Sequence, residues 1–319
     1  IYNMEKCLVT KLNGSVNRDE LPVLGKIRIN IIGTNNTAQS SGVTGLIEIG
    51  NSSLTWKGDG KCSISSDNKK YFASIDKTSK GILFIDDKYK VESIDTTFTY
   101  GSNVSFEDIN KYCKNLTGLY LSNSEQEGDL AVLKDLCQLK VLHIDGSKIT
   151  GDLSKLQDIS NFTSINISKT SIVCDLSLFA NSFNLTNVEV SDTSTTGDLS
   201  VLAALDNMRS ITATSSGVTG DLSLFANKAS FRRFNYWQLL NTWNSESLRP
   251  SSMSKITGAF KFKTASDTDN FLKNMAKCSD EDVRDKVWFF QDSHRTSASD
   301  AAVSTLQNAG YTLSQLITD

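Results

Sequence analysis

Proline and histidine are scarce in this chain, and the motifs of common enzyme and metal sites are missing. Its 319 residues include two prolines and two histidines, His143 and His294. Neither histidine lies in a His-Glu-x-x-His or comparable metal-binding spacing, and no phosphate-binding loop or Gly-x-Ser-x-Gly motif occurs. Asp292-Ser293-His294 places triad-type residues side by side, whereas a working triad converges from separate elements. We therefore expect no catalytic residue, metal or cofactor, and we predict that the protein is not an enzyme.

The cysteines lack the spacing of a zinc site or of a disulfide framework. There are six of them, and no two form a Cys-x-x-Cys pair. Cys113, Cys137 and Cys174 fall inside the repeats described below, where we expect small buried thiols. This usage favours a reducing compartment.

Long apolar runs and an excess of positive charge are absent too. No apolar stretch approaches the roughly 18 residues that a membrane-spanning helix needs, and the formal net charge is −3. We therefore expect no membrane span and no nucleic-acid partner, because the latter needs a basic surface. Ile1 to Cys7 contains no apolar stretch typical of a secretory signal. A leader removed before Ile1 remains an alternative.

Short alternating runs predict β-structure for residues 1–100. Residues 26–31 and 46–49 alternate between apolar and polar side chains, and clusters of glycine, asparagine and aspartate separate such runs. Residues 81–85, followed by two aspartates and then by residues 89–91, indicate a hairpin. We expect a small antiparallel sandwich, whose role the sequence does not reveal.

The segment Gly-Asp-Leu recurs every 23 residues in the middle of the chain. Blocks of 23 residues open at Ser105, Gly128, Gly151, Cys174, Gly197 and Gly220. Cys174 replaces the glycine in one block without changing the phase. A fixed period of this length marks stacked supersecondary units that bury their apolar faces against one another.

Apolar residues occupy fixed columns of these blocks. The twelfth, fifteenth and seventeenth positions are apolar throughout, for example Leu139, Leu142 and Ile144. The last two alternate with polar residues, so they predict a short strand with one face inward. The third and sixth positions, such as Leu130 and Leu133, suit a helical or 3₁₀ turn on the opposite side.

The segment Phe162 to Ile172 resembles the Leu-x-x-Leu-x-Leu-x-x-Asn-x-Leu signature of the leucine-rich repeat superfamily. Where that family usually carries asparagine or cysteine, this chain has the hydroxyl residues Ser124, Ser147, Thr170, Thr193 and Ser216. A hydroxyl can still bond backbone groups at the turn. The joint Ile149 to Ser154, Ile-Thr-Gly-Asp-Leu-Ser, is similar to repeat proteins of gut Bacteroidota and their phages.

The resemblance implies an α/β solenoid with a parallel β ladder for residues 101–242. Beyond Thr242 the period breaks, and residues 243–319 predict strands and two helices. Such longer units are typical of the cap that closes a stack of repeats. With the β-rich residues 1–100, we expect three parts in the chain.

The aspartate at the second position of each of the five blocks from Gly128 onward has two interpretations. Stacked in register, the five side chains would lie about 5 Å apart, the spacing of strands. Each carboxylate could cap the turn that follows it by accepting backbone N–H bonds. The alternative is a ladder of Ca²⁺ sites, but each loop supplies one carboxylate only. We favour capping. The residues are Asp129, Asp152, Asp175, Asp198 and Asp221.

In the leucine-rich repeat family the concave sheet carries the partner-binding residues, beside the inward leucines. The corresponding positions here, the fourteenth, sixteenth and eighteenth of each block, are mostly small and polar. The candidate binding residues among them are Tyr120, His143, Asp145, Asn166, Glu189, Thr212, Arg233, Asn235 and Trp237. Aromatic and arginine side chains often lead binding hot spots, although Trp237 could equally pack against the loop that follows the repeats.

We predict a non-enzymatic binding or structural protein that recognises a protein or glycan partner through the concave face. The likeness to phage-encoded repeats implies an accessory virion protein for host attachment, with other virion proteins as partners. A bacterial surface adhesin without its leader, or a cytoplasmic protein, are alternatives, and the oligomeric state stays open. A glycan-active enzyme within residues 1–100 is the alternative from another class, with carboxylates available at Asp59, Asp67, Asp86 and Asp87.

Overall fold

The computed structural model divides the chain into two compact units, Ile1–Gly128 and Asp129–Asp319. The described residues are 27–32, 43–49, 54–58, 61–64, 70–75, 80–85, 91–95, 103–225, 228, 230–231, 233–235, 241–243, 258–277 and 287–319. Side chains are described from residue 91 onward, except those of residues 103, 235, 241, 258 and 259. The carboxylates proposed for an enzyme in residues 1–100 lie outside the described residues.

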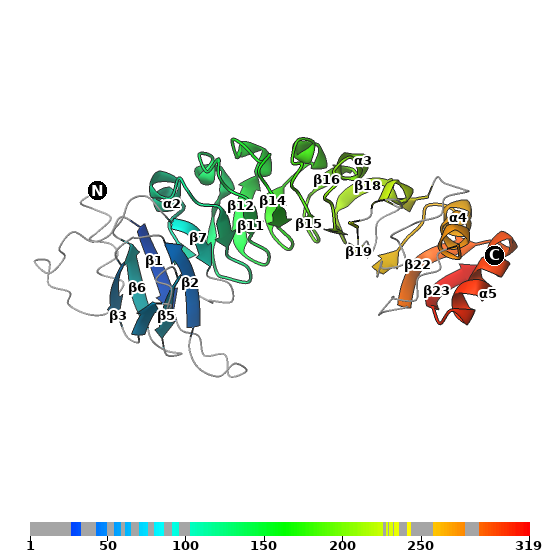
Figure 1. Ribbon diagram of the computed structural model, residues 1–319, viewed down its shortest axis with the longest axis horizontal. Helices are drawn as coiled ribbons and strands as arrows, with labels where there is room; N and C mark the ends of the chain where they lie inside the picture. Colours follow the sequence, from blue (N-terminus) through cyan, green and yellow to red (C-terminus); the bar gives the residue numbers. More distant parts are fainter. Residues whose placement is uncertain are drawn as a thin grey trace, which may run out of the picture. The chain divides into compact units, whose positions relative to one another are not determined.

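The first unit is rich in antiparallel β-structure, as the alternating runs predicted (Figure 1). Its strands are β1 (Ile27–Ile32), β2 (Val43–Ile49), β3 (Leu54–Gly58), β4 (Lys61–Ile64), β5 (Lys70–Ile75), β6 (Lys80–Ile85), β7 (Val91–Asp95), β8 (Asn103–Val104), β9 (Gly118–Tyr120) and β10 (Glu127–Asp129). One sheet has the strand order β3-β6-β1-β8. In a second sheet, β4, β5, β2 and β7 pair antiparallel in that order.

The hairpin expected from residues 81–91 does not form. Strand β6 pairs with β1 and β3, whereas β7 pairs with β2. The hairpin prediction was therefore wrong, because each strand finds its partners far away in the sequence. Strand β7 also pairs in parallel with β9, beyond helix α2 (Phe106–Tyr112). Parallel pairing thus begins upstream of the first expected repeat block.

The second unit contains a ladder of parallel strands, each separated from the next by one repeat (Figure 1). They are β11 (Val141–His143), β13 (Ser164–Asn166), β15 (Asn187–Glu189), β17 (Ser210–Thr212) and β19 (Arg233–Asn235). Successive strands pair at an offset of 23 residues, so that Leu142, Ile165 and Val188 lie on neighbouring rungs. The period in the sequence is therefore the structural repeat.

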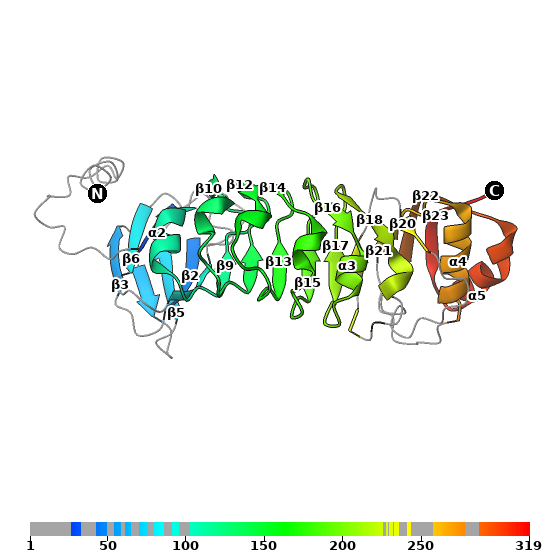
Figure 2. The same ribbon diagram turned by 90° about the horizontal axis from the view of Figure 1, so that it is seen from above.

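The predicted inward columns form the interior of this unit. From Leu139 to Phe234, every side chain of the twelfth and fifteenth columns, and of the seventeenth as far as Ala213, is at most 1% exposed. The opposite side is closed by η2 (Leu130–Leu133), η3 (Leu153–Lys155), η4 (Leu176–Phe179), α3 (Ser200–Ala203) and η5 (Leu222–Phe225), as Figure 2 shows. Their leucine and phenylalanine side chains at the third and sixth positions are buried. Burying a large apolar side chain contributes about 1.5–3 kcal/mol, so these columns hold the repeats together.

A hydroxyl in each repeat bonds the turn that follows the ladder strand, as predicted. Ser147 Oγ donates to the carbonyl of Ile144 at 2.6 Å and accepts from the backbone N–H of Ile149 at 3.5 Å. The same pair of bonds recurs at Thr170, Thr193 and Ser216. The preceding residue is left-handed in each repeat, with φ +57° at Lys169 and +54° at Asp192. The side-chain hydroxyl therefore closes this turn in each of these repeats.

A second series of short strands runs along the repeats. It comprises β12 (Lys148–Asp152), β14 (Ser171–Val173), β16 (Thr196–Asp198), β18 (Gly217–Asp221) and β20 (Asn241–Thr242). The block-opening glycines are left-handed, with φ +117° at Gly151 and +114° at Gly197. Cys174, which replaces this glycine, is not left-handed. Next to it, an isolated bridge connects Asp175, which lies just beyond β14, with Thr196 of β16. Strands β14 and β16 belong to separate sheets, so the series divides there.

Two of the three cysteines in the repeats are buried, as predicted. Burial raises the pKa of the Cys113 thiol and that of the Cys174 thiol to about 12. Cys137 is exposed, so the prediction of a buried thiol was wrong there. Cys137 is the tenth residue of its block, and Phe183 at the same position of a later block is 65% exposed. This column faces solvent.

The aspartate column caps the turns, which confirms the favoured interpretation. Asp152 Oδ1 accepts the backbone N–H of Ser154 at 2.8 Å, and Asp175 Oδ1 accepts that of Ser177 at 2.9 Å. Asp129, Asp198 and Asp221 accept from the residue two positions later in the same way. Among the described residues, no group of three or more histidine, cysteine, aspartate or glutamate side chains could hold a metal ion.

Acid should weaken the solenoid through these caps. Bonds from the hydroxyl and backbone N–H of Ser154 and Ser177 hold the pKa values of Asp152 and Asp175 below their usual range. A carboxyl with a lowered pKa stabilises the folded state above its unfolded pKa of about 3.9, and this stabilisation is lost as pH falls through the folded pKa. The free energy of unfolding in urea should therefore decline below about pH 4. Asp175→Asn keeps a cap acceptor that does not titrate, so its decline should be smaller; an unchanged pH profile would contradict this account.

The unit ends in three parallel strands and two helices, close to the expected ranges. The elements are β21 (Gly258–Phe260), α4 (Ala265–Met275), β22 (Val287–Arg295), η7 (Ser297–Ser299), α5 (Asp300–Asn308) and β23 (Thr312–Thr318). The strand order is β21-β22-β23, and helix α4 packs on β22 (Figure 2). Phe260, Phe271 and Trp288 meet in an aromatic core, with ring centroids 4.9 Å apart between the two phenylalanines.

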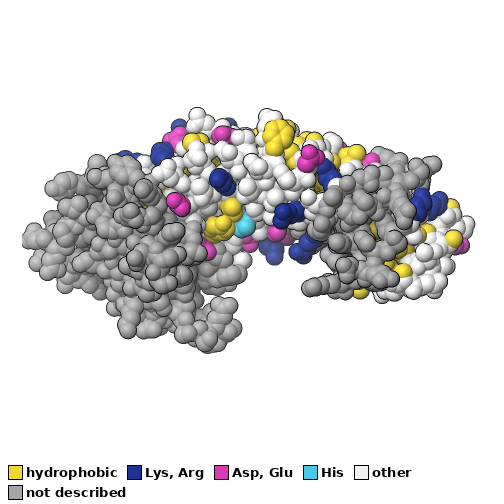
Figure 3. Space-filling view, viewed as in Figure 1, with side chains coloured by type: hydrophobic (Ala, Val, Ile, Leu, Met, Phe, Trp, Pro, Cys, Tyr) yellow, Lys and Arg dark blue, Asp and Glu magenta, His cyan; other side chains and the backbone are white. Residues whose placement is uncertain are grey.

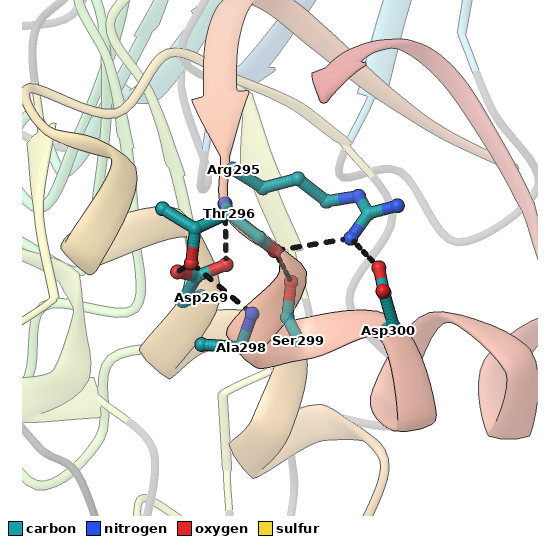
Figure 4. A network of polar contacts seen from close by, with 6 residues as sticks. All are labelled: Asp269, Arg295, Thr296, Ala298, Ser299 and Asp300. Carbon is teal, nitrogen blue, oxygen red and sulfur yellow. Dashed lines mark hydrogen bonds and ion pairs between the residues drawn. The ribbon is translucent and has the colours of Figure 1, made fainter. Parts of the chain in front are cut away.

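Two buried aspartates of α4 join this αβ region together. Asp267 caps its own helix in a capping box with Thr264 and also accepts the backbone N–H of Trp243 at 2.8 Å. Asp269, which is 4% exposed, accepts from both the backbone N–H and the hydroxyl of Thr296 (Figure 4). A buried carboxylate of this kind is tolerated because hydrogen bonds replace its hydration.

These features establish an α/β solenoid of the leucine-rich-repeat type, with a parallel β ladder, a β-rich first unit and a C-terminal αβ region, as predicted from the repeats. The division at residues 100 and 242 stays a prediction. In the parts of the chain that the structure describes, no helix is both long and apolar enough to span a membrane.

Candidate binding surface

The side chains that project outward from β11, β13, β15, β17 and β19 form one surface, here called the ladder face. It corresponds to the predicted concave face. Apart from the exposed Arg233, its described side chains from Val141 to Thr214 are half-buried or, at Ser191, 9% exposed. Uncharged atoms prevail over much of the repeats in the view of Figure 3, with charged side chains scattered among them. On the ladder face itself, Asp145, Glu189 and Arg233 carry charges, and most of the other described side chains are small and polar.

Neighbouring rungs of the ladder face are tied together by side-chain hydrogen bonds. His143 Nε2 lies 2.8 Å from Ser164 Oγ, which belongs to the next strand. Ser210 Oγ donates to Asn187 Oδ1 at 2.8 Å, again between adjacent strands. Because these bonds fix the rotamers, the polar groups are held in place before any ligand arrives.

Asn166 and Glu189 form the central pair of this surface. Asn166 Nδ2 donates to Glu189 Oε2 at 3.1 Å, and Asn166 Oδ1 accepts the backbone N–H of Ser168 at 3.1 Å. These two bonds define the orientation of the Asn166 amide. Burial raises the pKa of the Glu189 carboxyl, while Arg233 opposes this shift and Asp145 adds to it. Glu189 is therefore a partly desolvated acceptor with one charge of each sign nearby.

Glu189 and two residues on the following strands carry groups that can form further hydrogen bonds. Among the described residues, Glu189 Oε1, the Thr212 hydroxyl and the Arg233 guanidinium have no hydrogen-bond partner. Glu189 and Thr212 occupy the same rung position on adjacent strands. Arg233 lies on the next strand again, β19. Acceptor and donors thus lie on three successive strands.

The structure brings together six of the nine predicted binding residues on the ladder face of the second unit. They are His143, Asp145, Asn166, Glu189, Thr212 and Arg233. Tyr120 belongs to the first unit, where it lies half-buried on β9 opposite Asp95 of β7. Asn235 is placed on β19 by its backbone alone, and Trp237 lies outside the described residues.

Sequence reasoning missed the partners that orient these side chains. Ser164, Asn187 and Ser210 belong to the small polar positions that were not counted among the candidate binding residues, yet they make the bonds between rungs. Their signal was present, because all three occupy the fourteenth position of successive blocks. A column of hydrogen-bonding residues at strand spacing predicts contacts between rungs.

The tripeptide Asp292-Ser293-His294 does not assemble a catalytic site. Ser293 is fully buried, and its hydroxyl accepts the backbone N–H of Phe262 at 3.0 Å. His294 is exposed, and its Nδ1 lies 2.5 Å from Asp319. Ser293 and His294 are successive residues of strand β22, so their side chains point to opposite sides of the sheet.

Comparisons with known proteins find similarity among solved structures only. No family model and no curated protein matches the chain. The alignment with the plant peptide hormone receptor RGFR1, in complex with RGF2, covers 72% of this chain and 40% of the receptor chain, at 13% identity and a TM-score of 0.46. The internalin inlF from Listeria monocytogenes aligns with 72% of this chain and 82% of its own, at 18% identity and a TM-score of 0.40. The alignment with a plant ice-binding protein covers 71% of this chain and 73% of that protein's chain, at 16% identity and a TM-score of 0.43.

Proposed function

We propose that the protein is a non-enzymatic binding protein that recognises a protein or glycan partner through the ladder face. The observation that supports this most is the oriented polar surface built by Asn166, Glu189, Thr212 and Arg233, which keeps open hydrogen-bonding groups at its centre. Glu189 and Thr212 are half-buried and Arg233 is exposed, so these groups are accessible to a ligand. A partner with complementary donors and acceptors can replace their bonds to water with direct hydrogen bonds.

The rigid setting of these groups also favours binding. Each ladder strand from β11 to β17 is anchored by two buried side chains, such as Ile165 and Ile167 on either side of Asn166. Residues on rigid strands lose little conformational freedom when a ligand binds. The pairs His143–Ser164 and Asn187–Ser210 extend this ordering to the neighbouring side chains.

A pair of serine-to-arginine variants tests the ladder face as the binding surface. Ser210→Arg places a bulky charge on the ladder face, whereas Ser171→Arg places it on the exposed strand β14 of the second series. The tagged chain should be screened on an array of neutral and acidic oligosaccharides and against a displayed peptide library. Binding to any hit should be lost in Ser210→Arg and kept in Ser171→Arg. Hits that survive Ser210→Arg, or that fail equally in both variants, would rule the ladder face out.

The finer part of the proposal places the protein on a virion, or else on a cell surface. The similarity of the Ile149 to Ser154 joint to repeats of gut Bacteroidota and their phages supports it. Capsid and tail genes beside this gene would support a virion accessory protein. A secretion leader encoded before Ile1 would support the adhesin instead.

A further inference from the structure

We propose that the groups around Glu189 form a subsite for a neutral glycan, that is, for a chain of sugars without charged substituents. This inference rests on the proposed binding function of the ladder face and specifies its ligand. It uses four residues from four consecutive strands, namely Asn166, Glu189, Thr212 and Arg233.

The open hydrogen-bonding groups match the chemistry of sugar hydroxyls. Glu189 Oε1 can only accept, the Arg233 guanidinium can only donate, and the Thr212 hydroxyl can do both. A sugar hydroxyl can donate to the carboxylate while it accepts from the guanidinium or from threonine. Glu189 and Thr212 lie on adjacent strands, about 4.8 Å apart across the ladder. Neighbouring hydroxyl groups of one sugar ring can therefore engage both.

The charges favour a neutral ligand over an ionic one. Arg233 lowers and Asp145 raises the pKa of Glu189, so a charge of each sign acts on the same carboxyl. A cationic ligand at Glu189 would meet Arg233, and an anionic ligand at Arg233 would meet Glu189 and Asp145. An uncharged ligand can use the acceptor and the donors without either repulsion.

The apolar side chains argue in the same direction. Protein interfaces depend on a few large anchors, mainly aromatic, that fill dry pockets. The exposed large apolar residues of the described chain are Val173, Phe183, Leu224, Val287, Phe289 and Ile317. None of them belongs to the ladder strands β11, β13, β15, β17 and β19. Within the part of the chain that the structure describes, the subsite thus offers hydrogen bonds without a large exposed apolar anchor.

Two conservative substitutions test the glycan subsite. Glu189→Gln removes the charge but keeps the shape, and Thr212→Val removes the hydroxyl but keeps the volume. Binding of the best neutral oligosaccharide from the array, measured by isothermal titration calorimetry, should weaken about tenfold in Glu189→Gln and about fivefold in Thr212→Val. Thr219→Val, at an exposed position of β18, should bind like the wild type. Circular dichroism should show an unchanged fold in all three variants.

The outcomes separate this inference from the function on which it rests. If neutral glycans bind and both substitutions weaken them, the subsite is supported. If only acidic glycans or displayed peptides bind, and Ser210→Arg abolishes that binding, the ladder-face function stands while the glycan subsite is wrong. Neutral-glycan binding that is equal in the wild type, Glu189→Gln and Thr212→Val would also overturn the subsite. If nothing binds in a way that depends on Ser210, both proposals fail.

Discussion

Replacing Gly197 with alanine should lower the free energy of unfolding by about 3 kcal/mol or more. A Cβ atom at this position would lie 2.8 Å from the backbone nitrogen of Leu176 and 2.9 Å from its Cβ. The neighbouring atoms belong to the preceding repeat, so neither can move without disturbing the stack. The φ angle of +114° is also one that alanine rarely adopts. Urea unfolding followed by circular dichroism would measure the loss.

Gly217 provides the matched control for this prediction. It lies in β18, its φ is not left-handed, and an added Cβ would be 3.1 Å from the Thr196 methyl group. The added Cβ would also lie 3.2 Å from the backbone carbonyl oxygen of Thr195. Both contacts are tight but longer than those at Gly197, and no left-handed φ adds strain, so Gly217→Ala should cost less than Gly197→Ala. Equal losses in the two variants would show that the close approach of successive repeats is not what requires glycine.

The same geometry explains why one repeat departs from the others. At Gly151, Gly197 and Gly220 the left-handed glycine lets the chain pass close to the leucine of the preceding block. Cys174 does not take that conformation, and beside it one bridge from Asp175 to Thr196 replaces regular pairing. The sequence showed that Cys174 keeps the phase of the repeat. Its effect on the strands could not be predicted, because it depends on backbone angles.

The period of 23 residues made the ladder and its interior predictable. Residues of one column, such as Leu142, Ile165 and Ile211, are buried because a fixed spacing brings equivalent residues onto neighbouring rungs. One error arose where no repeat guided the prediction, and another where residue type was considered without the repeat column. In the first unit, the pairing of β6 with β1 depends on residues far away in the sequence. At Cys137 an apolar residue type was taken as buried, although its column faces solvent.

The candidate site was predictable as a surface but not as a network. The block positions identified which side chains face outward, including Asn166 and Glu189. They could not show that the Asn166 amide donates to Glu189, because that bond depends on the rotamers of both side chains. Nor could they show the raised pKa of Glu189, since burial on an outward face depends on the size of its neighbours.

Replacing Asp269 with alanine should destabilise the C-terminal αβ region by about 3 kcal/mol. Asp269 is buried and accepts the backbone N–H and the hydroxyl of Thr296, which begins the turn before α5 (Figure 4). Its loss removes two hydrogen bonds that the half-buried Thr296 donates to a buried carboxylate. Hydrogen bonds to charged groups contribute about 1.5–3 kcal/mol each. Hydrogen exchange of the α5 amides should therefore accelerate by about a hundredfold, since 1.4 kcal/mol corresponds to a factor of ten.

Asp300→Ala is the matched control, because Asp300 belongs to the same network but lies at the surface. Its carboxylate pairs with Arg295 while its side chain is 61% exposed. The Arg295 side chain is only 11% exposed, but its guanidinium keeps the Thr296 carbonyl as an acceptor when Asp300 is removed. This variant should therefore accelerate exchange in α5 clearly less than Asp269→Ala. Asp269→Asn should fall between the two, because its amide oxygen can still accept the Thr296 N–H. If Asp300→Ala accelerates exchange as much as Asp269→Ala, the contact between α4 and the turn before α5 depends on the charge of Arg295 rather than on the hydrogen bonds of Asp269.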